Sequence, residues 1–150
     1  MPNLNTFGVV GGIDLSALNT LPSATRFTRD EIEFFYSHAY SVYGAGSYDK
    51  AQAMFSWLRV YAPTDSRIAR GLAWSLKMLG DYDSAATSWA FVALLEPENP
   101  EPVLRMAESL TLSGQTQEAA RALRSLVDYC EASHRDPATC TKARDLLSAL

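Results

Sequence analysis

Three glycines stand 34 residues apart in the chain, at Gly46, Gly80 and Gly114. Four other landmarks keep the same spacing. They are small alanines, large apolar residues, tyrosines and prolines, at Ala51, Ala85 and Ala119; Phe55, Trp89 and Leu123; Tyr48 and Tyr82; and Pro63 and Pro97. An internal period of this length is typical of a chain that folds as stacked copies of one small unit.

A period of 34 residues is that of the tetratricopeptide repeat, in which helix A and helix B are joined by a tight turn. The glycines fall where helix A passes to helix B, and a Cβ atom there would obstruct the turn. The alanines fall where two helices cross closely, and the large apolar residues fill the space between repeats, so both sets are predicted to be core. We therefore predict an all-α solenoid of three tandem repeats, with a C-terminal capping helix and a flexible N-terminal extension.

The boundaries of these parts follow from glycines, prolines and capping signals. Residues 1–27 hold three glycines and two prolines and do not match the repeat, so we expect a flexible extension with a short helix, at about 13–21, that could serve dimerisation. A capping box from Thr28 to Glu31 starts the folded domain, which is predicted over 28–150. Within it we place repeats at about 32–65, 66–99 and 100–133, and a capping helix at about 137–149.

The A helices of such a stack line its concave face, and three tyrosines on the first of them share one helical side. Tyr36, Tyr40 and Tyr43 are four and three residues apart. Trp74 takes the place of Tyr40 in the second repeat, with Arg70 and Lys77 one turn to either side. Aromatic rings with polar tips suit an extended peptide, and the cations could pair with its carboxylates or carbonyls. The predicted peptide-binding groove is Tyr36, Tyr40, Tyr43, Arg70, Trp74 and Lys77.

Two qualifications belong to this groove. The aromatic residues could instead pack between helices, and Tyr43 is the strongest case because it lies next to the turn. Charged residues also fall at groove-facing positions; they are Glu33, Arg67, Glu101, Arg105 and Glu108. Other charged residues are interpreted as a solvated face; they are Asp49 with Lys50, Arg121 with Arg124, and the stretch 142–145.

Composition excludes several other functions. The net charge of −4 argues against a nucleic-acid interface, which needs a basic face. No apolar run approaches the roughly 18–20 residues that span a bilayer, and no secretory signal precedes the domain, so we predict a cytoplasmic protein without membrane insertion. Cys130 and Cys140 form no CxxC pair. Free thiols are the preferred interpretation in a reducing cytosol, and a disulfide is the geometrically feasible alternative.

The sequence gives little support to catalysis. His38 and His134 are far apart, and His38 is expected to pack between helices. No carboxylates fall at the spacing of metal ligands, and neither a phosphate-binding loop nor a nucleophile elbow is present. We therefore predict no enzymatic activity, no metal and no cofactor.

Beyond the generic repeat, the chain resembles the translocator chaperones of bacterial type III secretion systems. The resemblance covers roughly residues 30–130. The Asp-Ser-Arg junction at 65–67 and the Ala-Glu-Ser-Leu stretch at 107–110 are its more specific parts. The matching segments are 39–43, 46–51 and 54–55 in the first repeat, 65–67, 71–72 and 78–85 in the second, and 106–110, 114 and 118–119 in the third.

The resemblance implies a cytoplasmic chaperone that binds hydrophobic translocator proteins and keeps them soluble and export-competent. It implies that an extended client segment with spaced Pro and Leu residues lies in the concave groove, and that a homodimer forms in some members through the N-terminal region. Two alternatives stay open. One is a chaperone of a needle subunit or an early substrate, bound as a helix, and the other is a general scaffold that joins two folded proteins.

Overall fold

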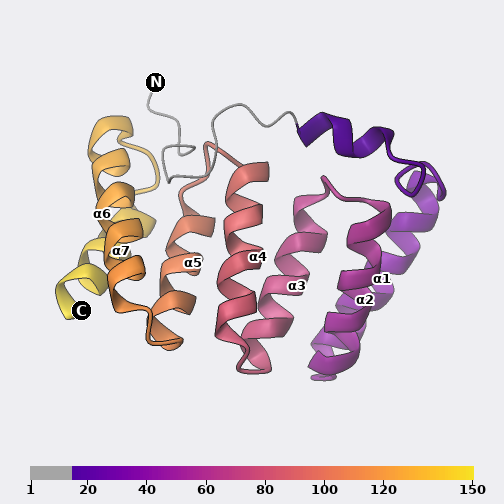
Figure 1. Ribbon diagram of the computed structural model, residues 1–150, viewed down its shortest axis with the longest axis horizontal. Helices are drawn as coiled ribbons and strands as arrows, with labels where there is room; N and C mark the ends of the chain where they lie inside the picture. Colours follow the sequence, from indigo (N-terminus) through magenta and orange to yellow (C-terminus); the bar gives the residue numbers. More distant parts are fainter. Residues whose placement is uncertain (1–14) are drawn as a thin grey trace.

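The computed structural model describes residues 15–150, so the first fourteen residues of the predicted extension lie outside the described part. The described chain starts with a 3₁₀ helix, η2, at Leu15–Thr20, within the stretch where a short helix was expected. α-Helices follow in antiparallel succession, side by side along one axis (Figure 1). They are α1 Arg29–Gly44, α2 Tyr48–Tyr61, α3 Ser66–Met78, α4 Tyr82–Leu95, α5 Glu101–Leu112, α6 Thr116–Ser133 and α7 Pro137–Ala149. The all-α repeat prediction is confirmed.

Each turn between an A helix and its B helix is built in the same way. Gly46, Gly80 and Gly114 have φ angles of 80°, 80° and 83°. The amide after each glycine donates to a carbonyl five residues earlier, at distances of 3.2, 3.0 and 2.9 Å. A Cβ on any of these glycines would meet no atom within 4 Å. Glycine is therefore required for its left-handed backbone, and not, as the sequence suggested, because a side chain would obstruct the turn.

The core consists of the residues that the repeat singles out. The three repeated alanines are fully buried, and so are Phe55, Trp89 and Leu123. One further contact is tighter than the sequence suggested. A Cβ added to Gly71 on α3 would lie 2.5 Å from the ring of Phe55, so the absence of a side chain lets α3 approach α2.

The two ends of the stack are built differently. At the C-terminal end, α7 lies against α5 and α6 and packs Ala143, Leu146 and Leu147 onto the last core cluster. At the N-terminal end, Thr28 and Glu31 form the predicted capping box, with N–H to oxygen distances of 3.2 and 2.7 Å. Beside it, aromatic side chains of α1 and α2 face outward.

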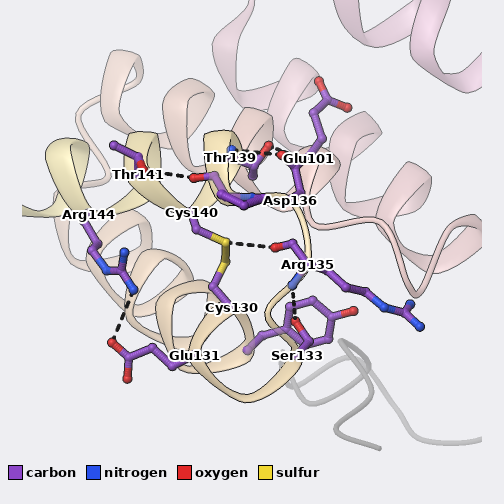
Figure 2. Close-up of a disulfide and its surroundings, with 12 residues drawn as sticks. Glu101, Cys130, Glu131, Ser133, Arg135, Asp136, Thr139, Cys140, Thr141 and Arg144 are labelled. Carbon is purple, nitrogen blue, oxygen red and sulfur yellow. Dashed lines mark hydrogen bonds and ion pairs between the residues drawn. A yellow bond between two sulfur atoms is a disulfide. The ribbon is translucent and has the colours of Figure 1, made fainter.

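The prediction of free cysteines is wrong, because Cys130 and Cys140 form a disulfide (Figure 2). The reason is the short reversal between α6 and α7. His134 and Asp136 have positive φ angles of 52° and 44°, and α7 turns back along α6. The two Cα atoms come to 5.8 Å, within the range that a disulfide spans. The prediction of free thiols rested on the expected reducing compartment, and the sequence pattern does not reveal the reversal between α6 and α7.

Candidate functional site

The A helices α1, α3 and α5 present one shared face, which we call the A-helix face; it carries all six predicted groove residues. Tyr40 is its most open aromatic residue, with 63% of its surface exposed. Tyr36 lies one turn away and is half-buried, with its ring centroid 6.2 Å from those of both Tyr40 and Phe55. Burial raises the pKa of the Tyr36 phenol. Tyr36 thus supports the exposed ring of Tyr40 from the core side.

Tyr43 is placed differently from the other two tyrosines. Its ring meets that of Tyr48 edge to face at 5.2 Å, and it packs against the core of the first repeat. Burial also raises the pKa of its phenol. This is the interhelical packing that the sequence left as the alternative for Tyr43. His38, expected between helices, is exposed instead.

Trp74 lies half-buried in the middle of the A-helix face. Its ring stands perpendicular to that of Trp89, with 5.3 Å between centroids. The ammonium of Lys77 and the guanidinium of Arg105 lie 5.2 and 5.1 Å from the Trp74 centroid. Two cations are therefore held at the indole of Trp74, an arrangement that its ring quadrupole favours.

The cations around Trp74 belong to a chain of ion pairs, which we call the α3–α5 ion network. Arg70 binds Glu96 at 2.6 Å and Glu101 at 2.8 Å. Arg105 binds Glu101 at 2.7 Å and Glu108 at 3.1 Å, and Lys77 completes the network on Glu108 at 3.2 Å. The members alternate in sign in the order Glu96, Arg70, Glu101, Arg105, Glu108 and Lys77. Each side chain is about three-quarters buried, so solvent screens these pairs less than ordinary surface pairs.

The network changes how Arg70 and Lys77 can act. Hydrogen bonds from Arg70, more than any other contact, lower the pKa of Glu96 to about 2, and the same contacts raise the pKa of Arg70. Arg70 and Lys77 therefore already have carboxylate partners within the chain. A bound peptide would meet them as parts of a neutral lattice around Trp74, not as isolated charges.

A second pairing links the first repeat to the second. Arg67 on α3 donates to Glu33 on α1 and to Asp65, and its guanidinium carbon lies 4.7 Å from the ring centroid of Tyr36. Sequence reasoning placed Glu33 and Arg67 on the same face but missed that they pair. The available signal was their opposite charge at the repeat spacing, together with the spacing of 31 residues shared by Arg70–Glu101 and Lys77–Glu108.

Across the described part of the chain, no three His, Cys, Asp or Glu side chains come together as metal ligands. Among residues 15–150, no helix is both long and apolar enough to cross a membrane.

Comparisons with known proteins found similarity among solved structures but not among family models or curated sequences. No protein-family model matches the sequence, and no curated protein sequence matches it. Among solved structures, the chain is similar to the type III secretion chaperone SycD of Yersinia enterocolitica in complex with a peptide of the translocator YopD. The identity is 29% and the TM-score 0.70, over 81% of this chain and 93% of that one.

The chain is also similar to PcrH, known from Pseudomonas aeruginosa, in complex with the chaperone-binding region of PopD. Here the identity is 27% and the TM-score 0.72, over 83% of this chain and 93% of that one. SycD alone has also been solved as an alternative dimer, which matches this chain at 28% identity with a TM-score of 0.69, over 81% of this chain and 92% of that one.

Proposed function

We propose that this chain acts as a class II, tetratricopeptide-repeat translocator chaperone of a type III secretion system, which binds hydrophobic translocator proteins in the bacterial cytoplasm and keeps them soluble and export-competent. The observation that carries the proposal is the similarity, over four-fifths of the chain, to chaperones solved with translocator peptides. The similar proteins are chaperones, so the role is binding and not catalysis.

The proposed binding site is the A-helix face, where an extended client segment lies across α1 and α3. Tyr40 supports this placement because a large, amphipathic ring that is 63% exposed is an anchor still available to a partner. Trp74 offers the uncovered part of its indole in the next repeat. Spaced apolar side chains of the client, such as Pro and Leu, would pack on these rings while the phenol and indole groups meet the client's backbone.

Tyr36 and Tyr43 have a supporting role in this proposal. Tyr36 is held between Tyr40, Phe55 and Arg67, so it fixes the position of Tyr40 and contributes only its outer edge. Tyr43 is engaged with Tyr48 and shapes the end of the face near the turn. Arg70 and Lys77 hold α3 against α5, and we propose that they contact the client mainly through the edge of the α3–α5 ion network.

The N-terminal end of the stack supports a second partner, a further copy of the chain. We call it the N-terminal aromatic face; it consists of Phe27, Phe34, Phe35, Trp57, Val60 and Tyr61. The aromatic rings of this set contact one another in succession, Phe34 is 71% exposed and Val60 is 54% exposed. A hollow of about 240 Å³ opens between Phe35, Met54 and Trp57. An apolar surface of this kind is typical of an interface, and we propose that it carries the homodimer.

The test separates the two faces with one pair of variants on the same helix. Tyr40→Ala and Phe34→Ala each remove an exposed aromatic ring from α1. Calorimetric titration with a Pro- and Leu-spaced translocator peptide should show binding weakened on the order of tenfold by Tyr40→Ala and unchanged by Phe34→Ala. Sedimentation of the two variants should show the reverse pattern for self-association.

Circular dichroism controls for folding, since both positions are surface positions. If the folded Tyr40→Ala protein binds the peptide as the unmodified chain does, the A-helix face is not the binding site. If no translocator peptide binds the folded chain at all, the translocator-chaperone function itself is rejected.

A further inference from the structure

The last two helices are connected twice, by the short reversal between them and by the disulfide from Cys130 to Cys140 (Figure 2). Cys130 lies near the end of α6, and Cys140 lies in the first turn of α7. The geometry points to a reversible redox site: we propose that this pair interconverts between dithiol and disulfide and thereby sets how readily the capping helix α7 opens from the stack. Nothing in this inference depends on a bound client.

The surroundings of the pair suit both redox states. Both cysteines are buried in the cluster that also contains Leu126 and Ala143, where a free thiol behaves as a small apolar group. The Sγ atom of Cys140 lies 3.2 Å from the backbone carbonyl oxygen of Arg135, so in the reduced protein its S–H has an acceptor to donate to. With the two Cα atoms 5.8 Å apart, the bond needs no displacement of either helix.

Non-covalent contacts hold α7 only weakly. Of its side chains, only Thr139, Cys140 and Ala143 are buried, and Leu146 and Leu147 add half-buried apolar contacts with the cluster. Its ion pair from Arg144 to Glu131 and the nearby pair from Arg135 to Glu98 are both largely exposed, and such pairs contribute little. The N-cap hydrogen bond from Thr139 to Asp136 fixes the start of the helix but does not attach it to α6. The disulfide is therefore the strongest attachment of α7 to the stack.

The exchange chemistry requires a low-molecular-weight disulfide, such as oxidised glutathione. The thiolate of one cysteine attacks a glutathione sulfur, forms a mixed disulfide and releases one glutathione thiolate. The thiolate of the second cysteine then attacks the cysteine sulfur of the mixed disulfide and releases the second glutathione. Two electrons and two protons pass from the cysteine pair to glutathione disulfide, which becomes two molecules of reduced glutathione.

Opening of α7 has a defined consequence for the last repeat. Leu126, Val103 and Leu104 belong to the cluster that α7 covers, so opening would uncover an apolar end surface. Terminal caps of solenoid proteins prevent such exposure. Under reducing conditions the disulfide of the structure is converted to the dithiol, and the cap then opens more often. Oxidation locks the cap.

Hydrogen exchange measured by mass spectrometry tests this inference on the full chain. One sample is equilibrated with excess glutathione disulfide and the other with dithiothreitol. Closing a loop with a sequence separation of 10 should reduce opening on the order of 100-fold, seen as slower exchange of amides in Pro137–Ala149 in the oxidised sample. Amides of α3, Ser66–Met78, serve as an internal control and should exchange equally in both samples.

The matched variant is Cys130→Ala with Cys140→Ala, which should exchange at the same rate under both conditions and close to the reduced unmodified chain. Two results overturn the inference. One is that alkylation and intact mass show both thiols still free after equilibration with glutathione disulfide. The other is that the disulfide forms but exchange in α7 does not change. The comparison of the two samples of the unmodified chain decides the matter even if the double variant does not fold.

Discussion

Replacing Arg70 by methionine tests whether Arg70 stabilises the helical stack or serves mainly to bind a ligand. Arg70 donates to Glu96 at 3.0 and 2.6 Å and to Glu101 at 2.8 Å. Methionine has a similar length and can still pack toward the Trp89 ring, whose centroid lies 5.8 Å from the guanidinium carbon. The substitution therefore removes the charge and the hydrogen bonds while leaving much of the packing.

The size of the effect follows from Glu96, whose pKa falls from 4.5 to about 2, with hydrogen bonds from Arg70 as the largest cause. At about 1.4 kcal/mol per pH unit, this difference corresponds to about 3 kcal/mol of folding free energy. Arg70 and Glu96 are 26% and 21% exposed, so solvent screening reduces the expected loss to about 2 kcal/mol. Asn99 still donates to Glu96 at 2.7 Å in the variant, which keeps part of the interaction.

The dependence on pH has a definite sign. A carboxyl group whose pKa is lowered in the folded protein contributes stability that is fully present above its unfolded pKa of 4.5 and is lost as the pH falls toward 2. The free energy of unfolding, measured by urea denaturation, should differ between the unmodified chain and Arg70→Met by about 2 kcal/mol at pH 7. At pH 3 the difference should shrink to about 1 kcal/mol.

The control is Arg121→Met, which removes an exposed pair with Glu118 and should change stability by less than about 0.5 kcal/mol. A loss of equal size at pH 7 and pH 3 would show that Arg70 acts through packing and not through Glu96. No loss at pH 7, together with weaker binding of a translocator peptide, would refute the reasoning and return Arg70 to the role of a ligand-binding residue.

Three further substitutions test the fold by urea denaturation. Gly71→Ala should lower the free energy of unfolding by about 1–2 kcal/mol, because the new Cβ would lie 2.5 Å from the Phe55 ring, and this outweighs the better helix propensity of alanine. A stabilised Gly71→Ala variant would contradict this explanation. So would a variant whose stability is not restored by adding Phe55→Leu. Gly80→Ala should lower the free energy of unfolding by about 1–2 kcal/mol, solely because residue 80 has a φ angle of 80°. Gly80→Asn should lower it less, and equal losses in the two variants would argue against a backbone cause. Thr28→Ala should cost about 1 kcal/mol by removing the capping box, and an unchanged midpoint would show that α1 begins independently of it.

The period of the sequence was sufficient to predict the fold because the same packing problem is solved at each repeat. Gly46, Gly80 and Gly114 locate the turns, and the alanines and large apolar residues locate the core. These features are local or follow from helical periodicity, so they can be derived without coordinates. Gly71 breaks no period and carries no turn signal, so its contact with Phe55 could not be derived in this way.

The candidate site was predictable as a face but not as a set of contacts. Helical spacing places Tyr36 and Tyr40 on one side of α1, whereas the partner of Tyr43 depends on where α2 crosses. The pairing of Arg70 and Lys77 with carboxylates of the next repeat depends on the lateral offset between α3 and α5. That offset is a property of packed helices and is not encoded in the spacing within either one. The disulfide depended in the same way on a reversal at two left-handed residues.

The three matching turns make the stack extensible. Gly46, Gly80 and Gly114 share one backbone conformation and one hydrogen-bond pattern. Each repeat therefore connects its A helix to its B helix through the same turn geometry. Inserting 34 residues at such a turn therefore adds one more repeat to the stack without requiring a new type of turn. A chaperone built in this way could match a longer client by duplicating a unit that already folds, while its two dissimilar ends stay as they are.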